Sequence, residues 1–202
     1  MPAPIDWQTD AAFAYRTEPP TVCSRVLRPL RLVLEERGLA SAPAIEALEV
    51  RYREGDERVH VADWYALLED ALARTANPLL GLYWAQKAAT VSGTIGLVEY
   101  LLRTSRSLRG ALACLVSYGC LFQDDLAFDS VFEGAAVRLR LRSCRGSPIP
   151  PVWSEAVLAY CSFLLTSLLG FPAVSSQHWV LSFTHPGPAA TDSYRRLLRA
   201  CV

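Results

Sequence analysis

The sequence predicts an α+β fold, in which an N-terminal helical part is followed by a small antiparallel sheet covered by helices. Apolar residues recur at helical spacing over most of residues 22–122. The period then changes, because apolar residues and arginines alternate strictly over residues 137–142. A nearly continuous apolar run over residues 152–169 indicates a further helix.

The first twenty residues differ from the rest. They hold four prolines and no sustained period, so we expect residues 1–20 to form an extended or disordered arm. No glycine- or serine-rich linker divides the remainder, which predicts one domain over residues 21–202. Its first helix is expected to run from Val22 to a C-cap at Gly38, with Pro29 kinking it or splitting it in two.

The remaining helices and strands follow from the same periodicities. Glu133-Gly134-Ala135 separates two runs of strand character and predicts a hairpin with one apolar and one arginine face. A third strand is expected from Trp179 to Thr184. The predicted helices after the first cover residues 44–50, 61–72, 78–88, 97–103, 108–122, 152–169 and 191–198.

Composition limits the class of protein. Lysine plus arginine and aspartate plus glutamate both number 20, so no net charge draws the chain to nucleic acid or an anionic membrane. The six cysteines include no C-x-x-C pair, and the first residues do not form a secretory signal, which predicts free thiols in the cytoplasm. The apolar run 156–169 is shorter than the ~20 residues that span a bilayer. It is interpreted as a buried core helix.

The motifs of common enzymes are missing. The sequence has no G-x-S-x-G elbow, phosphate-binding loop or dinucleotide turn, and its three histidines lack metal-ligand spacing. We therefore predict no enzymatic activity, no metal and no cofactor. A thiol hydrolase is a less favoured alternative, in which Cys120 or Cys161 would meet His178 or His185. The neighbouring Asp124 and Asp125 are interpreted as a solvated turn.

Two groups of residues are candidates for binding a ligand. Arginines on one strand face could hold a carboxylate or phosphate, although an ordinary solvated face explains them as well. Aromatic side chains could line an apolar pocket, although most of them must belong to the core. The candidate ligand-binding residues are Trp84, Tyr100, Tyr118, Phe122, Arg138, Arg140 and Trp179.

Short motifs occur in a telling order. They are Leu34 to Leu39 (LEERGL), Arg58-Val59, Thr75 to Leu82 (TANPLLGL), Gly93 to Gly96 (GTIG), Ser105 to Leu112 (SRSLRGAL), and Phe183 to Pro188 (FTHPGP) followed by Tyr194. In this order they resemble the N-terminal effector-binding domain of AraC-type transcriptional regulators, in the subfamily called the arabinose-binding domain. The sequence departs from the family pattern at Asn77, at Arg106-Ser107 and at Ala200-Cys201-Val202, which leaves the ligand unassigned.

The resemblance implies a function in transcription regulation. The domain would bind a small-molecule effector, partly apolar by its aromatic content, and form a homodimer. It would act on DNA only through a C-terminal helix-turn-helix region, which we expect to be missing after Val202, and it would not contact a membrane. A dimerisation module without a ligand is the alternative.

Overall fold

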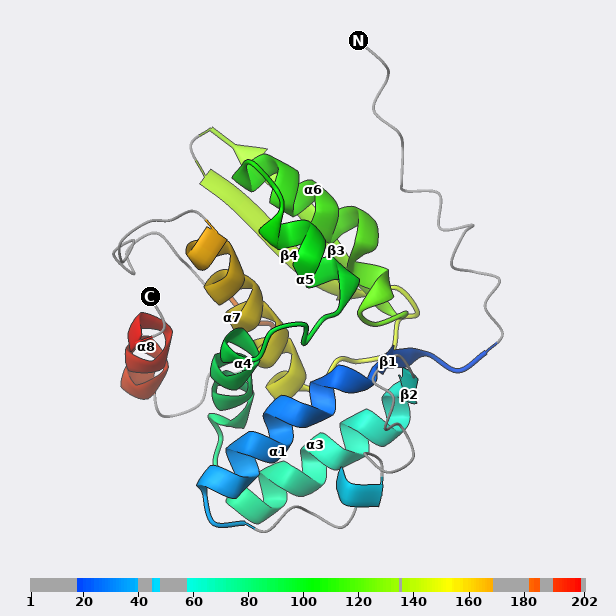
Figure 1. The fold of residues 1–202 in the computed structure, drawn as a ribbon, viewed down its shortest axis with the longest axis vertical. Coiled ribbons are helices and arrows are strands. Elements are labelled where there is room, and N and C mark those ends of the chain that lie inside the picture. Colours follow the sequence, from blue (N-terminus) through cyan, green and yellow to red (C-terminus); the bar gives the residue numbers. More distant parts are fainter. Residues whose placement is uncertain are drawn as a thin grey trace.

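The computed structural model describes residues 18–39, 45–47, 58–134, 136–168, 182–185 and 191–200 (Figure 1). Two of the elements, η2 and η3, are single 3₁₀ turns. In chain order the elements are β1 (Thr21–Cys23), η2 (Ser24–Val26), α1 (Leu27–Glu36), β2 (Arg58–His60), α3 (Val61–Thr75), α4 (Leu80–Thr90), α5 (Leu97–Arg103), α6 (Leu108–Tyr118), η3 (Gly119–Leu121), β3 (Leu126–Glu133), β4 (Ala136–Ser143), α7 (Pro151–Leu168) and α8 (Thr191–Ala200). The predicted α+β class is confirmed.

Helix α7 runs through the centre of the molecule, between the α1–α3 pair and the β3–β4 hairpin (Figure 1). Nearly all its side chains are buried, which confirms a core helix. Its Trp153 meets the edges of Trp64 on α3 and Trp84 on α4, with ring centroids 5.0 Å and 4.9 Å away. These three buried indoles join three helices at the middle of the core.

The N-terminal part differs from the sequence prediction. Val22 lies in β1, where it pairs with Val59 of the antiparallel β2, and not in a helix. Helix α1 begins only at Leu27, after the turn η2. Pro29 therefore sits in the first turn of α1, where its missing N–H has no helical partner to lose, and it neither kinks nor splits the helix. The prediction of one helix from Val22 to Gly38 was wrong at its start.

The predicted hairpin is confirmed. Strands β3 and β4 are antiparallel, with Phe128 opposite Leu141 and Asp129 opposite Arg140. The apolar side chains of β4 are half-buried against the core, and its arginines are exposed. Successive side chains point to opposite faces of a sheet, so Phe128 and the arginines lie on opposite faces of the hairpin.

Other predictions fall partly or wholly outside the described residues. Helix α5 has the predicted bounds, and α3, α4, α6 and α8 lie within a few residues of theirs. The helix predicted over 44–50 is described only at residues 45–47, which are helical. Of the predicted third strand, residues 179–181 lie outside the described part, and residues 182–184 do not form a strand. Residues 1–17 of the predicted arm lie outside the described part of the chain.

Candidate ligand-binding site

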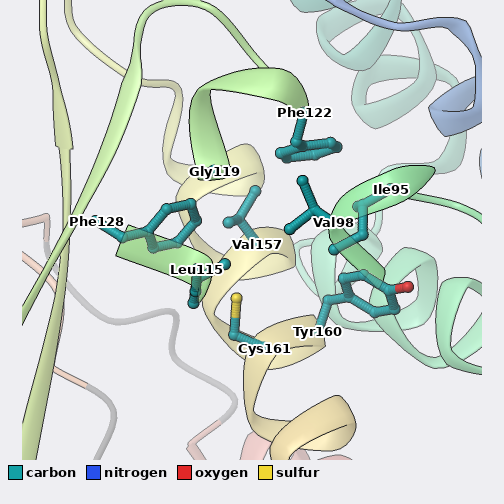
Figure 2. Close-up of a pocket in the computed structure, with 9 residues that line it drawn as sticks. All are labelled: Ile95, Val98, Leu115, Gly119, Phe122, Phe128, Val157, Tyr160 and Cys161. Atoms are coloured by element: carbon teal, nitrogen blue, oxygen red, sulfur yellow. The ribbon is translucent and has the colours of Figure 1, made fainter. Parts of the chain in front are cut away.

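A small cavity lies where α5, α6, η3, β3 and α7 meet (Figure 2). The surface facing it is entirely apolar. The cavity volume, counted as the space that the centre of a water-sized sphere can reach, is about 10 Å³. One water molecule needs about this much space. The cavity is therefore closed to any metabolite in this conformation. Its lining residues are Ile95, Val98, Leu115, Gly119, Phe122, Phe128, Val157, Tyr160 and Cys161.

The β3–β4 hairpin closes one side of the cavity through Phe128. The aromatic ring lies against the backbone of Gly119, where a β-carbon would be 2.5 Å from Cδ2 and 2.8 Å from Cε2. Gly119 has ordinary helical angles, φ −57° and ψ −30°. The glycine therefore serves close approach here rather than an unusual backbone conformation. Figure 2 shows the Phe128 ring opposite Val98 and Tyr160 across the cavity.

Tyr160 forms the opposite wall with its ring. Its hydroxyl donates to Oε2 of the buried Glu99, 3.0 Å away, and the Arg103 guanidinium donates to Oε1 of the same carboxylate at 2.8 Å. Burial raises the pKa of Tyr160, and the charge of Glu99 raises it further. The hydroxyl therefore stays protonated and ties α7 to α5. Figure 2 shows it pointing away from Leu115 and Cys161.

Cys161 directs its thiol sulfur toward Leu115 and Val157 (Figure 2). Burial raises the pKa of this thiol to about 12. A thiol of such pKa is protonated at neutral pH and is a weak nucleophile. No histidine lies among the residues that line the cavity with it. Cys120 is half-buried rather than buried, and His178 lies outside the described residues.

His185, from the last of the sequence motifs, contacts Glu155 of α7, and Tyr194 lies near the same carboxylate. The His185 Nε2 atom lies 2.9 Å from Glu155 Oε1. Burial raises the pKa of Tyr194, and the nearby carboxylate of Glu155 raises it further. This cluster joins the C-terminal part to the core helix, so the histidine is engaged in a structural contact.

The residues that follow Phe122 in the chain belong to a buried polar network. Directly after Phe122, the side chain of Gln123 donates to Tyr65 Oη at 2.9 Å and to Asp125 Oδ1 at 2.6 Å. Its carbonyl oxygen accepts from Trp153 Nε1 at 2.7 Å. Gln123 is fully buried and Asp125 nearly so. Interpreting Asp125 as part of a solvated turn was therefore wrong.

The interpretation of Asp124 as part of a solvated turn was also wrong, because its carboxylate is held in an ion pair. Its Oδ1 accepts from Arg58 Nη2 at 2.8 Å, and its Oδ2 accepts from Thr21 Oγ1 at 2.6 Å. Arg58 also donates to the backbone oxygens of Thr21 and Leu121. These bonds connect β1 and β2 to the segment that carries Phe122.

A family comparison identifies the domain. The model described as the arabinose-binding domain of AraC transcription regulator, N-terminal, matches residues 38–202. The chain belongs to this family. No protein of established function matches it closely in sequence. The matched region begins after α1 and contains every residue that lines the cavity.

The aromatic residues predicted to bind a ligand are dispersed in the structure. Phe122 lines the cavity. Trp84 is buried beside it, its ring centroid 5.8 Å from that of Tyr160, and donates Nε1–H to Val26 O. Tyr100 and Tyr118 are 64% and 47% exposed. Trp179 lies outside the described residues.

The predicted arginines lie on the outer face of the hairpin. Arg138 pairs with Glu133 at 3.1 Å, and Arg140 is exposed opposite Asp129. Apart from Phe122, no residue of the cavity lining was among the predicted ligand-binding residues; the apolar helix residues Val98, Leu115 and Val157 are examples. Helical periodicity assigns such residues to the core but does not show which of them border a space.

No cluster of three histidine, cysteine, aspartate or glutamate side chains in the described ranges is arranged to hold a metal ion. None of the described helices combines the length and the apolar character needed to cross a bilayer.

Proposed function

We propose that this chain is the effector-sensing and dimerisation domain of an AraC-type transcription regulator, and not an enzyme. The match of the family model over residues 38–202 carries this proposal. Residues 21–202 would form the sensing unit in the cytoplasm, and DNA would be bound through a helix-turn-helix region outside this sequence. The chemistry agrees, since the buried thiol of Cys161 faces apolar side chains.

Sensing requires two states with different affinities for the effector. The cavity is too small for a metabolite in the present conformation. In this proposal the present conformation is therefore the effector-free state of the domain. An effector that binds the other state shifts the population by its difference in affinity and by no more. The cavity is a suitable place for such a shift, because helices and the hairpin meet there.

Dimerisation is supported by exposed apolar side chains. Leu97 and Tyr100 on α5, with Tyr118 and Leu121 at the end of α6 and in η3, are each about half exposed or more. Exposed aromatic side chains such as Tyr100 and Tyr118 are enriched at protein interfaces. A ligand-free dimerisation module is the second candidate function, and this exposed surface is the observation in its favour.

A thermal-shift screen of metabolites and fatty acids tests the sensing function. A specific effector raises the melting temperature with its concentration, as binding to the folded state requires. If no compound does so while sedimentation shows a stable dimer, the ligand-free module is correct. A monomer at tens of micromolar, with a specific effector found, would retain sensing and remove dimerisation. In the sedimentation measurement, the Tyr100→Glu variant is the control, because it places a charge among the exposed apolar side chains.

A further inference from the structure

We infer that the effector is an uncharged, largely apolar molecule that enters the core at the cavity between α6, η3, β3 and α7. This inference rests on the sensing function proposed above. It assigns the site and the chemical class of the ligand, which the family name does not do. A sugar such as the arabinose of that name would be a poor ligand for this site.

The lining decides the chemical class. It exposes no polar surface to the cavity. A hydroxyl or carboxylate placed there would lose its hydrogen bonds to water without replacement, at a cost of roughly 2–7 kcal/mol for a neutral group. The one hydroxyl of the lining, on Tyr160, is already bonded to Glu99. A sugar would bury several hydroxyl groups in this way, whereas a largely apolar molecule such as a simple alcohol would bury one at most.

The arginines of the hairpin do not reach this site. Phe128 faces the cavity from β3, and the neighbouring Asp129 faces the opposite side of the hairpin. Arg142 pairs with Asp129 at 3.0 Å on that outer side, and Arg140 lies directly across from Asp129. An acid group bound by these arginines would be separated from the cavity by the sheet.

The hairpin contributes one wall of the cavity. Phe128 is the one residue of β3 and β4 in the cavity lining. The apolar residues of β4 on the same face, Val137, Leu139 and Leu141, are only half-buried. A displacement of the hairpin that lifts the Phe128 ring from Gly119 would cost the packing of this buried ring, which binding of the effector would have to offset. The space vacated by the ring joins the existing cavity.

Phe122 connects the cavity to the N-terminal part. Phe122 lines the cavity, and its backbone oxygen accepts from Cys23 N of β1 at 2.9 Å. The next two residues hold the Gln123 network and the Arg58–Asp124 ion pair. A ligand that displaces Phe122 would therefore shift the anchoring of β1 and β2. This gives the site a physical route by which occupancy alters a distant surface.

Isoleucine methyl NMR provides a local test. The sequence has four isoleucines, Ile5, Ile45, Ile95 and Ile149, and Ile95 lines the cavity while Ile45 is buried elsewhere. The full chain, labelled at the isoleucine δ1 methyl groups, is titrated with hexan-1-ol, hexanoate and L-arabinose at equal concentrations. We expect hexan-1-ol to shift the Ile95 signal and leave the Ile45 signal unchanged. Hexanoate and arabinose should shift neither signal.

A pair of matched variants locates the binding. Val157→Ile adds one methylene to the cavity lining and should weaken hexan-1-ol binding by about tenfold. Val131→Ile makes the same change on the exposed outer face of the hairpin and should leave binding unchanged. If Val157→Ile fails to fold, Val98→Ile replaces it, because Val98 also borders the cavity.

The outcomes separate this inference from the proposed function. Shifts caused by arabinose or hexanoate would retain effector sensing but overturn the apolar class. Hexan-1-ol binding that Val157→Ile leaves unchanged would overturn the site. No response of Ile95 to hexan-1-ol would overturn both site and class, while the metabolite screen would still decide whether the domain senses an effector.

Discussion

The ring of Phe128 occupies the place that a side chain on Gly119 would need. A β-carbon there would lie 2.5 Å from Cδ2 of the ring. We therefore expect Gly119→Ala to lower the free energy of unfolding by about 1–3 kcal/mol through overpacking. Gly119 has helical angles, so backbone strain does not contribute. Urea denaturation followed by tryptophan fluorescence measures the change.

A double-mutant cycle identifies the cause. Phe128→Ala removes the ring and by itself should cost ~3–5 kcal/mol. In that background Gly119→Ala should cost less than about 0.5 kcal/mol, because the two residues are in direct contact. An equal cost of Gly119→Ala with and without the ring would show that Phe128 is not what excludes a side chain.

Gly81 permits the closest approach of α4 to α7. A β-carbon at this position would overlap the backbone oxygen of Val152. Backbone atoms cannot rotate away as a side chain does, so Gly81→Ala should cost about 3 kcal/mol or more, above the cost at Gly119. Gly110→Ala is the control, because its nearest contact is the Ser107 side chain at 3.3 Å. A near-neutral Gly81→Ala would refute this helix packing.

Gln123 satisfies several buried groups at once. Gln123→Leu leaves the Trp153 indole N–H and the Asp125 carboxylate without their partner. We expect a loss of about 2 kcal/mol or more, since each unsatisfied buried group costs ~1–3 kcal/mol. Gln86→Leu is the matched control, because Gln86 is half-buried and donates a long bond to Leu197 O at 3.3 Å. Similar losses for both variants would contradict the network.

The elements with a local signal were the ones that the sequence predicted. Strand β4 has a strict period of two after a glycine turn, and α5 lies between two loop signals. Strand β1 has no such signal. It is three residues long and pairs with β2, with Thr21 opposite His60, so it depends on contacts far along the sequence. Helical spacing around Val22 was therefore misleading.

The candidate site depends even more on tertiary structure. Periodicity marked Leu115 and Val157 as apolar helix positions, yet only the packing of α6 against α7 and β3 places them around one space. Polarity was also a poor guide. Asp125 is charged and follows a helix, which indicates a solvated turn, but its contact with Gln123 buries it. Aromatic content predicted Phe122 as a ligand contact, which stays a prediction.

The buried thiol of Cys161 predicts a loss of stability at alkaline pH. Burial raises its pKa from 9.0 in an exposed thiol to about 12. Between these values the unfolded chain releases a proton that the folded chain keeps. The free energy of unfolding therefore falls as pH rises, by up to about 1.4 kcal/mol per pH unit. Urea denaturation between pH 9 and 10, below the usual ionisation of tyrosine, should show a shallower slope for Cys161→Ala than for the wild type. Equal slopes would mean that water reaches this thiol in the folded state.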